Sequence, residues 1–173
     1  MENKTPFMPE IPEKEPQRQQ YFMAHAKEQL HILEENLGRP LTCCINTFGC
    51  QMNARDSEKL LGILETIGYQ AVETEDADFV LYNTCTVREN ANLRVYGRLG
   101  QLGARKKKHP HMMIALCGCM MQEKEVVEKI KKTYRFVDLI FGTHNIFKLA
   151  ELVSLCLEER LEKLEAQGRE DKK

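Results

Sequence analysis

The chain has 173 residues, of which 42% are hydrophobic and 29% charged, and its formal net charge is −1 at pH 7. This composition is typical of one globular domain with short tails, and the balanced charge excludes nucleic-acid binding that depends on overall charge alone. No stretch reaches the roughly 18 consecutive apolar residues of a membrane-spanning helix, and no signal peptide is visible. We therefore expect a cytoplasmic protein that binds no membrane, and we expect a monomer.

The N-terminal region divides into two parts. Residues 1–20 are polar and rich in proline, which predicts a disordered lead-in. Over residues 21–38 apolar side chains recur at helical spacing, which predicts an N-terminal helix. Gly38 is expected to end this helix, because glycine is common directly after the last helical turn.

Strands and helices alternate over residues 41–165, which we interpret as one domain. The expected strands are residues 41–48, 69–72, 78–84, 111–118 and 136–142. The expected helices are residues 54–68, 89–107, 123–132 and 145–167. This alternation predicts an α/β fold, a doubly wound, flavodoxin- or Rossmann-like parallel sheet of about five strands with helices on both faces. By precedent we expect the strand order 2-1-3-4-5.

Three of the seven cysteines follow predicted strands directly. Cys50, Cys85 and Cys119 come after the first, third and fourth strands, which are neighbours in the expected order. Adjacent strands lie about 4.8 Å apart, so three consecutive strand ends span roughly 10 Å. Open α/β sheets bind ligands in the crevice at this edge. The three thiolates are therefore expected to converge on one metal centre.

The spacing of these cysteines distinguishes between kinds of metal site. An odd number of cysteines in a reducing compartment favours metal ligation, catalysis or burial over disulfides. A structural zinc site usually contains close C-x-x-C pairs, and this chain has none. Three separated cysteines fit an iron–sulfur cluster with one iron open to an outside ligand. Spacing alone also leaves open three unrelated buried thiols.

Residues near the cysteines have two interpretations each. Asn53, Asn83 and Thr84 are expected either to donate hydrogen bonds to cluster sulfurs or to cap the following helix. Arg88 either balances a negative cluster or lies in a solvated first helical turn. Gly49 permits a tight turn and close approach to a bulky ligand, and Gly118 does the same beside the third cysteine.

The other cysteines are expected in the core. Cys43 and Cys44 lie inside the first strand, and Cys156 lies in the apolar stripe of the last helix, where free cysteine behaves as a small hydrophobic residue. Cys117 could substitute as a ligand because it lies two residues before Cys119, but burial is the preferred interpretation.

Two further features lie outside the cysteine pattern. The basic run at residues 104–110 could contact nucleic-acid phosphates, but a solvated helix end is preferred, because cations there also favour the helix dipole. His144 follows the fifth strand and is expected to be a loop residue, with a cap of the last helix or a neighbour of the cluster as alternatives.

Four stretches carry a resemblance to a known family. They are TFGCQMN, NTCTVRENA, GCMMQ and FGTHNI, within residues 41–150. They resemble the N-terminal domain of the methylthiotransferases of the radical S-adenosylmethionine superfamily. The resemblance implies that Cys50, Cys85 and Cys119 bind an auxiliary [4Fe-4S] cluster with one open iron. The FGCQMN form favours the branch that acts on N6-isopentenyladenosine in tRNA over the branches that act on threonylcarbamoyladenosine or on a ribosomal protein.

The resemblance also implies a reaction. In that family the full-length enzyme uses two molecules of S-adenosylmethionine. One supplies a methyl group to sulfur at the auxiliary cluster, and the other is cleaved at a second [4Fe-4S] cluster to a radical. That radical abstracts hydrogen from C2 of the adenosine next to the anticodon, and the methylthio group is transferred to this carbon.

This chain lacks the C-x-x-x-C-x-x-C motif that binds the second cluster in the family. We therefore expect the radical S-adenosylmethionine and C-terminal RNA-binding domains to be absent from it and this fragment to be inactive alone. The expected partners of the full-length enzyme are tRNA, S-adenosylmethionine and the downstream radical domain.

Two other functions remain open. A flavodoxin-like binding or electron-transfer module would need a Ser-, Thr- and Gly-rich phosphate loop after the first strand, where this chain has TFGCQMNARDS. A scaffold fragment would bind a partner through the long C-terminal helix and carry no cluster.

Overall fold

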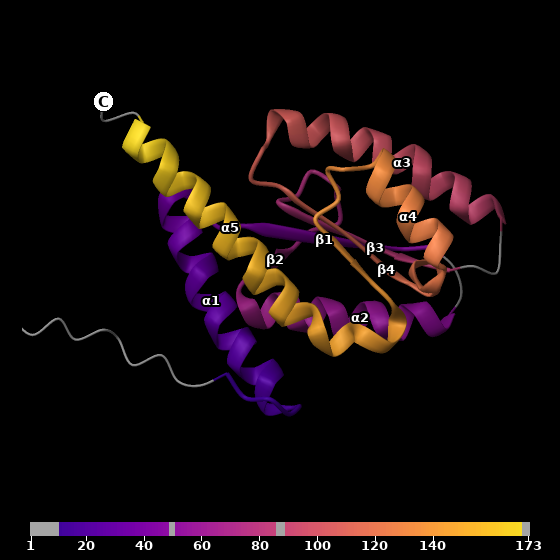
Figure 1. Cartoon of the computed structure of the whole chain (residues 1–173), viewed down its shortest axis with the longest axis horizontal. Coiled ribbons are helices and arrows are strands. Elements are labelled where there is room, and N and C mark those ends of the chain that lie inside the picture. Colours follow the sequence, from indigo (N-terminus) through magenta and orange to yellow (C-terminus); the bar gives the residue numbers. More distant parts are fainter. Residues whose placement is uncertain (1–10, 49–50, 86–88, 171–173) are drawn as a thin grey trace, which may run out of the picture.

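The computed structural model describes residues 11–48, 51–85 and 89–170 of the chain. It contains a five-stranded sheet in the order β2-β1-β3-β4-β5, and every neighbouring pair is parallel (Figure 1). The strands are β1 (Thr42–Thr47), β2 (Gln70–Ala71), β3 (Phe79–Thr84), β4 (Met113–Gly118) and β5 (Leu139–Phe141). The predicted fold class and strand order are confirmed.

Helices cover both faces of the sheet. One face carries α1 (Gln17–Leu37), α2 (Gln51–Ile67) and α5 (Leu149–Glu170), and the other carries α3 (Glu89–Lys108) and α4 (Lys124–Thr133) (Figure 1). All residues of β3 and β4 are buried, as expected for central strands of a parallel sheet. Two hydrophobic clusters, one on each face, form the core.

The alternation of side chains along the strands assigns the core cysteines to faces. Cys43 and Cys117 lie in the cluster beneath α1, α2 and α5, whereas Cys44 lies in the opposite cluster. Cys156 of α5 also lies in the first cluster. The prediction that Cys43, Cys44 and Cys156 are buried is confirmed.

The helix α1 belongs to the same core. It begins at Gln17, so the prediction that residues 17–20 continue the disordered lead-in is wrong. Pro16 directly precedes the helix, a region where the missing N–H of proline costs nothing. Gly38 ends the helix with φ of 73°, as predicted. The part of the predicted lead-in at residues 1–10 lies outside the described residues.

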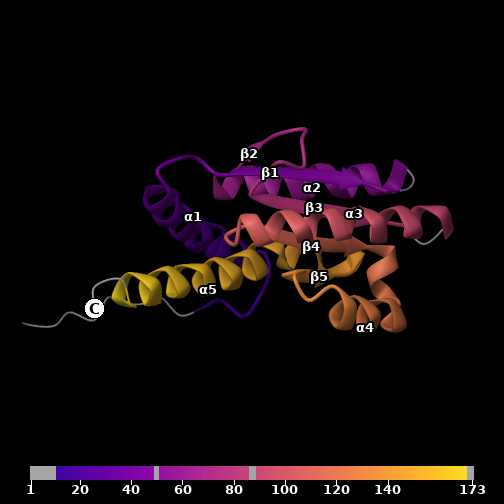
Figure 2. The same ribbon diagram turned by 90° about the horizontal axis from the view of Figure 1, so that it is seen from above.

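Contacts between α1 and α5 join the two ends of the chain. The hydroxyl of Ser154 donates a hydrogen bond of 2.7 Å to Oε1 of Gln29, and both side chains are buried. Arg18 of α1 pairs with Glu151 of α5. Figure 2 shows that α5 continues past the sheet, on the side away from the carboxyl ends of the strands.

Several predicted boundaries differ from those observed. Strands β4 and β5 begin two and three residues later than expected, because turns precede them: Met112 N donates to His109 O, and Val137 N donates to Tyr134 O. Residues predicted as the start of the last helix instead form a 3-10 segment, η2 (Thr143–Lys148), in which Asn145 has non-helical backbone angles. A second 3-10 segment, η1 (Cys119–Gln122), follows β4.

Helix α2 begins earlier than predicted and β2 is shorter than predicted, with only two residues. Within the three described ranges, no helix combines the length and apolar character that crossing a membrane requires.

Candidate functional site

Two of the three predicted cysteine ligands follow neighbouring strands at the same level. Thr84 and Gly118 are paired in the register of β3 and β4, and the next residues along the chain are Cys85 and Cys119. Cys85 is 5% exposed, whereas Cys119 is partly exposed. Because neighbouring strands lie about 4.8 Å apart, the structure brings these two residues together at the carboxyl edge of the sheet.

The third cysteine cannot be placed in the same way. Cys50 lies outside the described residues, as do Gly49 and Arg88. The chain on either side of it is described. On one side, Phe48 N donates a hydrogen bond of 2.7 Å to Asn83 O, so Phe48 lies beside the carboxyl end of β3. On the other side, α2 begins at Gln51.

A buried hydrogen-bond network joins the strand ends. The hydroxyl of Thr84 donates to Cys117 O at 2.7 Å, which links β3 to β4. Nδ2 of Asn53 donates to Thr84 O at 2.8 Å, which links α2 to β3. Nδ2 of Asn83 donates back to Asn53 O at 2.9 Å and to Oγ of Ser57 at 3.0 Å. Three of these side chains are at most 5% exposed: Asn53, Asn83 and Thr84.

These contacts give Asn83 and Thr84 a role that differs from the predicted one. Their donors bond to oxygen atoms of the protein, neither to a cluster sulfur nor to the next helix as a cap. Nδ2 of Asn53 donates to the backbone carbonyl of Thr84. The network therefore fixes the strand ends to one another and to the first turn of α2.

Gly118 permits the close approach of β3 and β4 at this edge. Its φ is 105°, in the region that favours glycine, and a Cβ there would lie 2.2 Å from Thr84 O and 2.8 Å from Oδ1 of Asn83. A side chain at this position would separate the strands or displace Cys119. The positive φ agrees with the predicted tight turn at Gly118, and the close approach that the structure shows there is between two strands.

One residue at the site was missed by sequence reasoning. The hydroxyl of Thr143, at the start of η2, lies 3.7 Å from Sγ of Cys119 and can hydrogen bond to it. The neighbouring His144, predicted from the sequence to be a loop residue, is exposed and lies in η2. A threonine two residues after the end of the fifth strand, directly after Gly142, was the signal that could have found this contact.

Comparison with known proteins gives the family. The model of the family described as Uncharacterized protein family UPF0004 matches residues 42–142, which is more than half of the chain. The chain belongs to UPF0004. The matched segment begins at the first residue of β1 and ends one residue after β5, so it contains the whole sheet and all three predicted cysteine ligands.

Individual relatives carry a functional name. A tRNA-2-methylthio-N(6)-dimethylallyladenosine synthase of Lachnoclostridium phytofermentans is 72% identical over 131 residues, which cover 76% of this chain and 29% of the relative. The proteins of the same name from Acetivibrio thermocellus and Clostridioides difficile are each 52% identical, over 144 and 132 residues. These alignments cover 83% and 73% of this chain, and 30% and 28% of the relatives. This chain therefore spans less than a third of the relatives' length.

The remaining cysteines of this UPF0004 chain have the properties of core residues. Burial raises the pKa of Cys43 to about 12 and that of Cys156 to about 11. Burial also raises the pKa of Cys44 and of Cys117. Burial therefore favours the neutral thiol at these four positions. For Cys117, packing in the core agrees with the preferred interpretation, burial.

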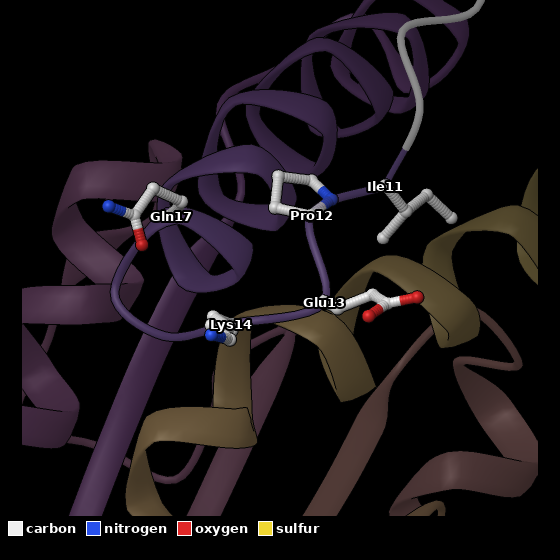
Figure 3. Close-up of a pocket in the computed structure, with 5 residues that line it drawn as sticks. All are labelled: Ile11, Pro12, Glu13, Lys14 and Gln17. Atoms are coloured by element: carbon white, nitrogen blue, oxygen red, sulfur yellow. The ribbon is translucent and has the colours of Figure 1, made fainter.

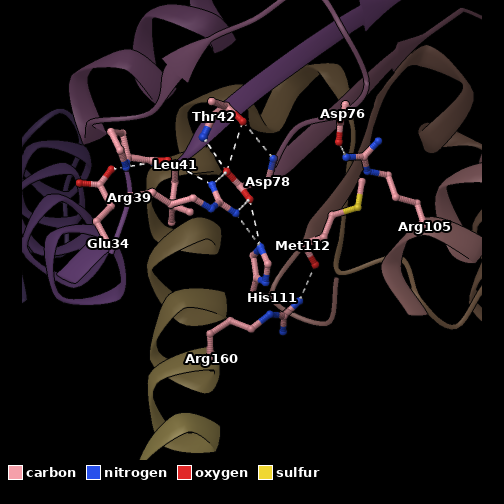
Figure 4. Close-up of polar contacts among 11 residues, drawn as sticks. Glu34, Arg39, Leu41, Thr42, Asp76, Asp78, Arg105, His111, Met112 and Arg160 are labelled. Atoms are coloured by element: carbon pink, nitrogen blue, oxygen red, sulfur yellow. Dashed lines mark hydrogen bonds and ion pairs between the residues drawn. The ribbon is translucent and has the colours of Figure 1, made fainter. Parts of the chain in front are cut away.

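Hydrogen bonds and ion pairs of charged residues join the strand starts at the opposite, amino edge of the sheet (Figure 4). Both guanidinium Nη atoms of Arg39 donate to the carboxylate of Asp78, at 2.7 and 2.8 Å, and Thr42 N donates at 2.9 Å. Burial alone would raise the pKa of Asp78, but hydrogen bonds from Arg39, Thr42 and His111 outweigh it and lower the pKa to about 2. This cluster fastens the start of β1 to the start of β3.

The basic run predicted at residues 104–110 lies at this amino edge. Four cations occupy the last turn of α3: Arg105, Lys106, Lys107 and Lys108. Arg105 pairs with Asp76, and Nζ of Lys106 lies 2.7 Å from Oδ2 of Asp138. Because a helix of this length spans about 30 Å, the run lies far from the cysteines. Lys107 and Lys108 are exposed, as the preferred interpretation of a solvated helix end expects, whereas Arg105 and Lys106 are partly buried in these ion pairs.

Two cavities lie beside the first half of α1. A cavity of about 850 Å³ lies beside the start of α1 and is lined by Ile11, Pro12, Glu13, Lys14 and Gln17 (Figure 3). A second, of about 630 Å³, lies between α1, α2 and η2 and includes Thr143 and His144. The described residues contain no group of three or more His, Cys, Asp or Glu that could hold a metal ion. This does not test the predicted trio, because Cys50 is not among them.

Proposed function

We propose that this chain is the auxiliary-cluster domain of a tRNA methylthiotransferase, in which Cys50, Cys85 and Cys119 bind a [4Fe-4S] cluster. The observation that carries the proposal is the register of β3 and β4, which places Cys85 and Cys119 one residue beyond a paired Thr84 and Gly118. The names of the relatives support the same activity.

The chemistry of the donor set fits the group. Thiolates are soft ligands that select iron–sulfur clusters and zinc, and three of them on separate loops leave one iron of a four-iron cluster without a protein ligand. When bound, the cluster would supply an open iron site for a sulfur-containing group. The hydrogen bonds that join the strand ends beside it come from amides and hydroxyls, which do not compete with thiolates for iron.

The name of the relatives indicates the substrate that we propose. It describes a methylthio group at position 2 of N(6)-dimethylallyladenosine in tRNA, and N6-isopentenyladenosine next to the anticodon is the substrate that the sequence resemblance implies. S-adenosylmethionine, a second [4Fe-4S] cluster and a downstream radical domain would act in the full-length enzyme. We propose that this enzyme acts in the cytoplasm as a monomer and that this chain alone is inactive.

Anaerobic reconstitution with iron and sulfide tests the ligand assignment. We expect about four irons per chain in the wild type, with the Mössbauer spectrum of a four-iron cluster. Cys50→Ala, Cys85→Ala and Cys119→Ala should each lose most of this iron. Cys43→Ala and Cys117→Ala are the matched controls, because their thiols lie in the core.

Two results would contradict the proposal. A wild type that folds fully and binds no iron would instead support a scaffold without a cluster. A cluster that survives all three substitutions, or that is lost in Cys117→Ala, would show that the ligand set is wrong.

A further inference from the structure

The backbone pairing of β3 and β4 ends directly before the cysteines. Thr84 and Gly118 are the last registered pair, so no further ladder bond of these two strands fixes Cys85 relative to Cys119. Metal ligands must be held within about 0.5 Å of the productive geometry by groups outside the ligand set. The chain therefore needs side-chain contacts that hold the strand ends together at this level.

Thr84 makes two such contacts at once. Its hydroxyl donates to Cys117 O at 2.7 Å, and its carbonyl accepts from Nδ2 of Asn53 at 2.8 Å. Thr84 is fully buried, and Asn53 is 5% exposed. In such surroundings water does not compete for these groups, so the two bonds hold their partners in fixed positions.

Each of these three residues lies within three positions of one of the predicted cysteine ligands in the sequence. Thr84 directly precedes Cys85, Asn53 lies three residues after Cys50, and Cys117 lies two residues before Cys119. We propose that Thr84, together with Asn53, is a positioning residue that sets the spacing of Cys85 and Cys119 before a cluster binds. This inference rests on the proposed function.

Thr84→Val tests the hydroxyl directly, because valine has nearly the same shape and cannot donate to Cys117 O. Thr84→Ser restores the hydroxyl. Asn53→Ala removes the hydrogen bond from Asn53 to Thr84 O. This second variant tests the positioning role even if Thr84→Val does not fold. The matched control is Ser154→Ala, which removes a buried hydrogen bond of 2.7 Å to Gln29, between α1 and α5.

The assay measures the rate at which each reconstituted protein loses iron to a chelator, at a temperature where circular dichroism shows every variant folded. The electron paramagnetic resonance spectrum of the reduced cluster is recorded as well. We expect Thr84→Val and Asn53→Ala to lose iron about 10- to 100-fold faster than the wild type, the usual effect of removing groups that orient metal ligands. Their spectra should change, while Thr84→Ser and Ser154→Ala should resemble the wild type.

The outcomes separate this inference from the proposed function. If the wild type binds no cluster, the ligand assignment fails and positioning fails with it. In a second outcome the wild type binds a cluster, but the folded Thr84→Val and Asn53→Ala proteins lose iron at the wild-type rate and give the wild-type spectrum. This outcome overturns the positioning role and leaves the ligand assignment intact. If Ser154→Ala accelerates iron loss as much as Thr84→Val does, the cause is a general loss of stability, and the positioning role is overturned as well.

Discussion

Replacing Gly118 with alanine should strongly destabilise the fold, because the added Cβ has no space. It would lie 2.2 Å from Thr84 O, 2.7 Å from Thr84 N and 2.8 Å from Oδ1 of Asn83. Two of these three atoms belong to the backbone of a central strand, which cannot move away as the end of a flexible side chain can. The φ of 105° adds strain for any residue with a side chain.

The size of the effect follows from these two causes. Holding a residue other than glycine in such a backbone region costs about 1–3 kcal/mol, and overpacking a closely packed site costs about 1–3 kcal/mol more. We expect a loss of about 4 kcal/mol in the free energy of unfolding. For a chain of 173 residues, this corresponds to a fall in Tm of roughly 8–16 °C.

Thermal unfolding followed by circular dichroism, with Gly97→Ala as the control, measures this effect. Gly97 is exposed in the middle of α3, and a Cβ there would meet nothing within 4 Å. The same substitution should therefore stabilise the protein by about 0.5–1 kcal/mol, because alanine favours the helix. A Gly118→Ala protein with the Tm of the wild type would refute the packing that we describe at this edge.

Three further predictions concern stability. Asp78→Asn should lower the free energy of unfolding by about 2 kcal/mol at pH 7. Because the pKa of Asp78 in the folded protein is depressed to about 2, this difference from the wild type should shrink as pH falls from about 4 toward 2. Urea titrations measure it, and a difference that stays constant with pH would contradict the prediction. Gly103→Ala should lower Tm, because its Cβ would lie 2.5 Å from Cε1 of Phe136, and Phe136→Leu in the same protein should recover part of the loss. Ser154→Ala should cost about 1 kcal/mol in urea unfolding, with no change if its bond to Gln29 contributes nothing.

The sheet could be predicted from the sequence because its signals are local. The buried runs Phe79–Thr84 and Met113–Gly118 each begin with four consecutive apolar or aromatic residues, and each is followed by a helical pattern. Alternation of this kind permits few topologies, since parallel crossovers have one hand and need a covering helix. The expected strand order in turn predicts that the three cysteines follow neighbouring strands.

The boundaries that were wrong depend on single turns and caps. Pro12 and Pro16 suggested disorder up to residue 20, yet Pro16 directly precedes α1. Strand β5 begins later than predicted because a turn precedes it, in which Val137 N donates to Tyr134 O. Neither feature changes the periodicity of apolar residues, which was the signal used to find these elements.

The hydrogen-bond partners of Thr84 could not be predicted, because they lie far along the chain. Asn53 is 31 residues away and Cys117 is 33 residues away. The sequence does show polar side chains at Asn83 and Thr84 within an otherwise apolar strand, and buried polar groups need partners. It does not show whether those partners are sulfur atoms of a cluster or oxygen atoms of the protein.

The two edges of the sheet hold their strands by different means, and the difference suits the proposed cluster. At the amino edge, ionised groups such as Arg39 and Asp78 join the strand starts. At the carboxyl edge, the described bonds between strand ends use amides, hydroxyls and backbone carbonyls. A carboxylate there would add negative charge beside thiolates and raise the cost of deprotonating them. The neutral groups of this network link the strand ends without adding such a carboxylate themselves.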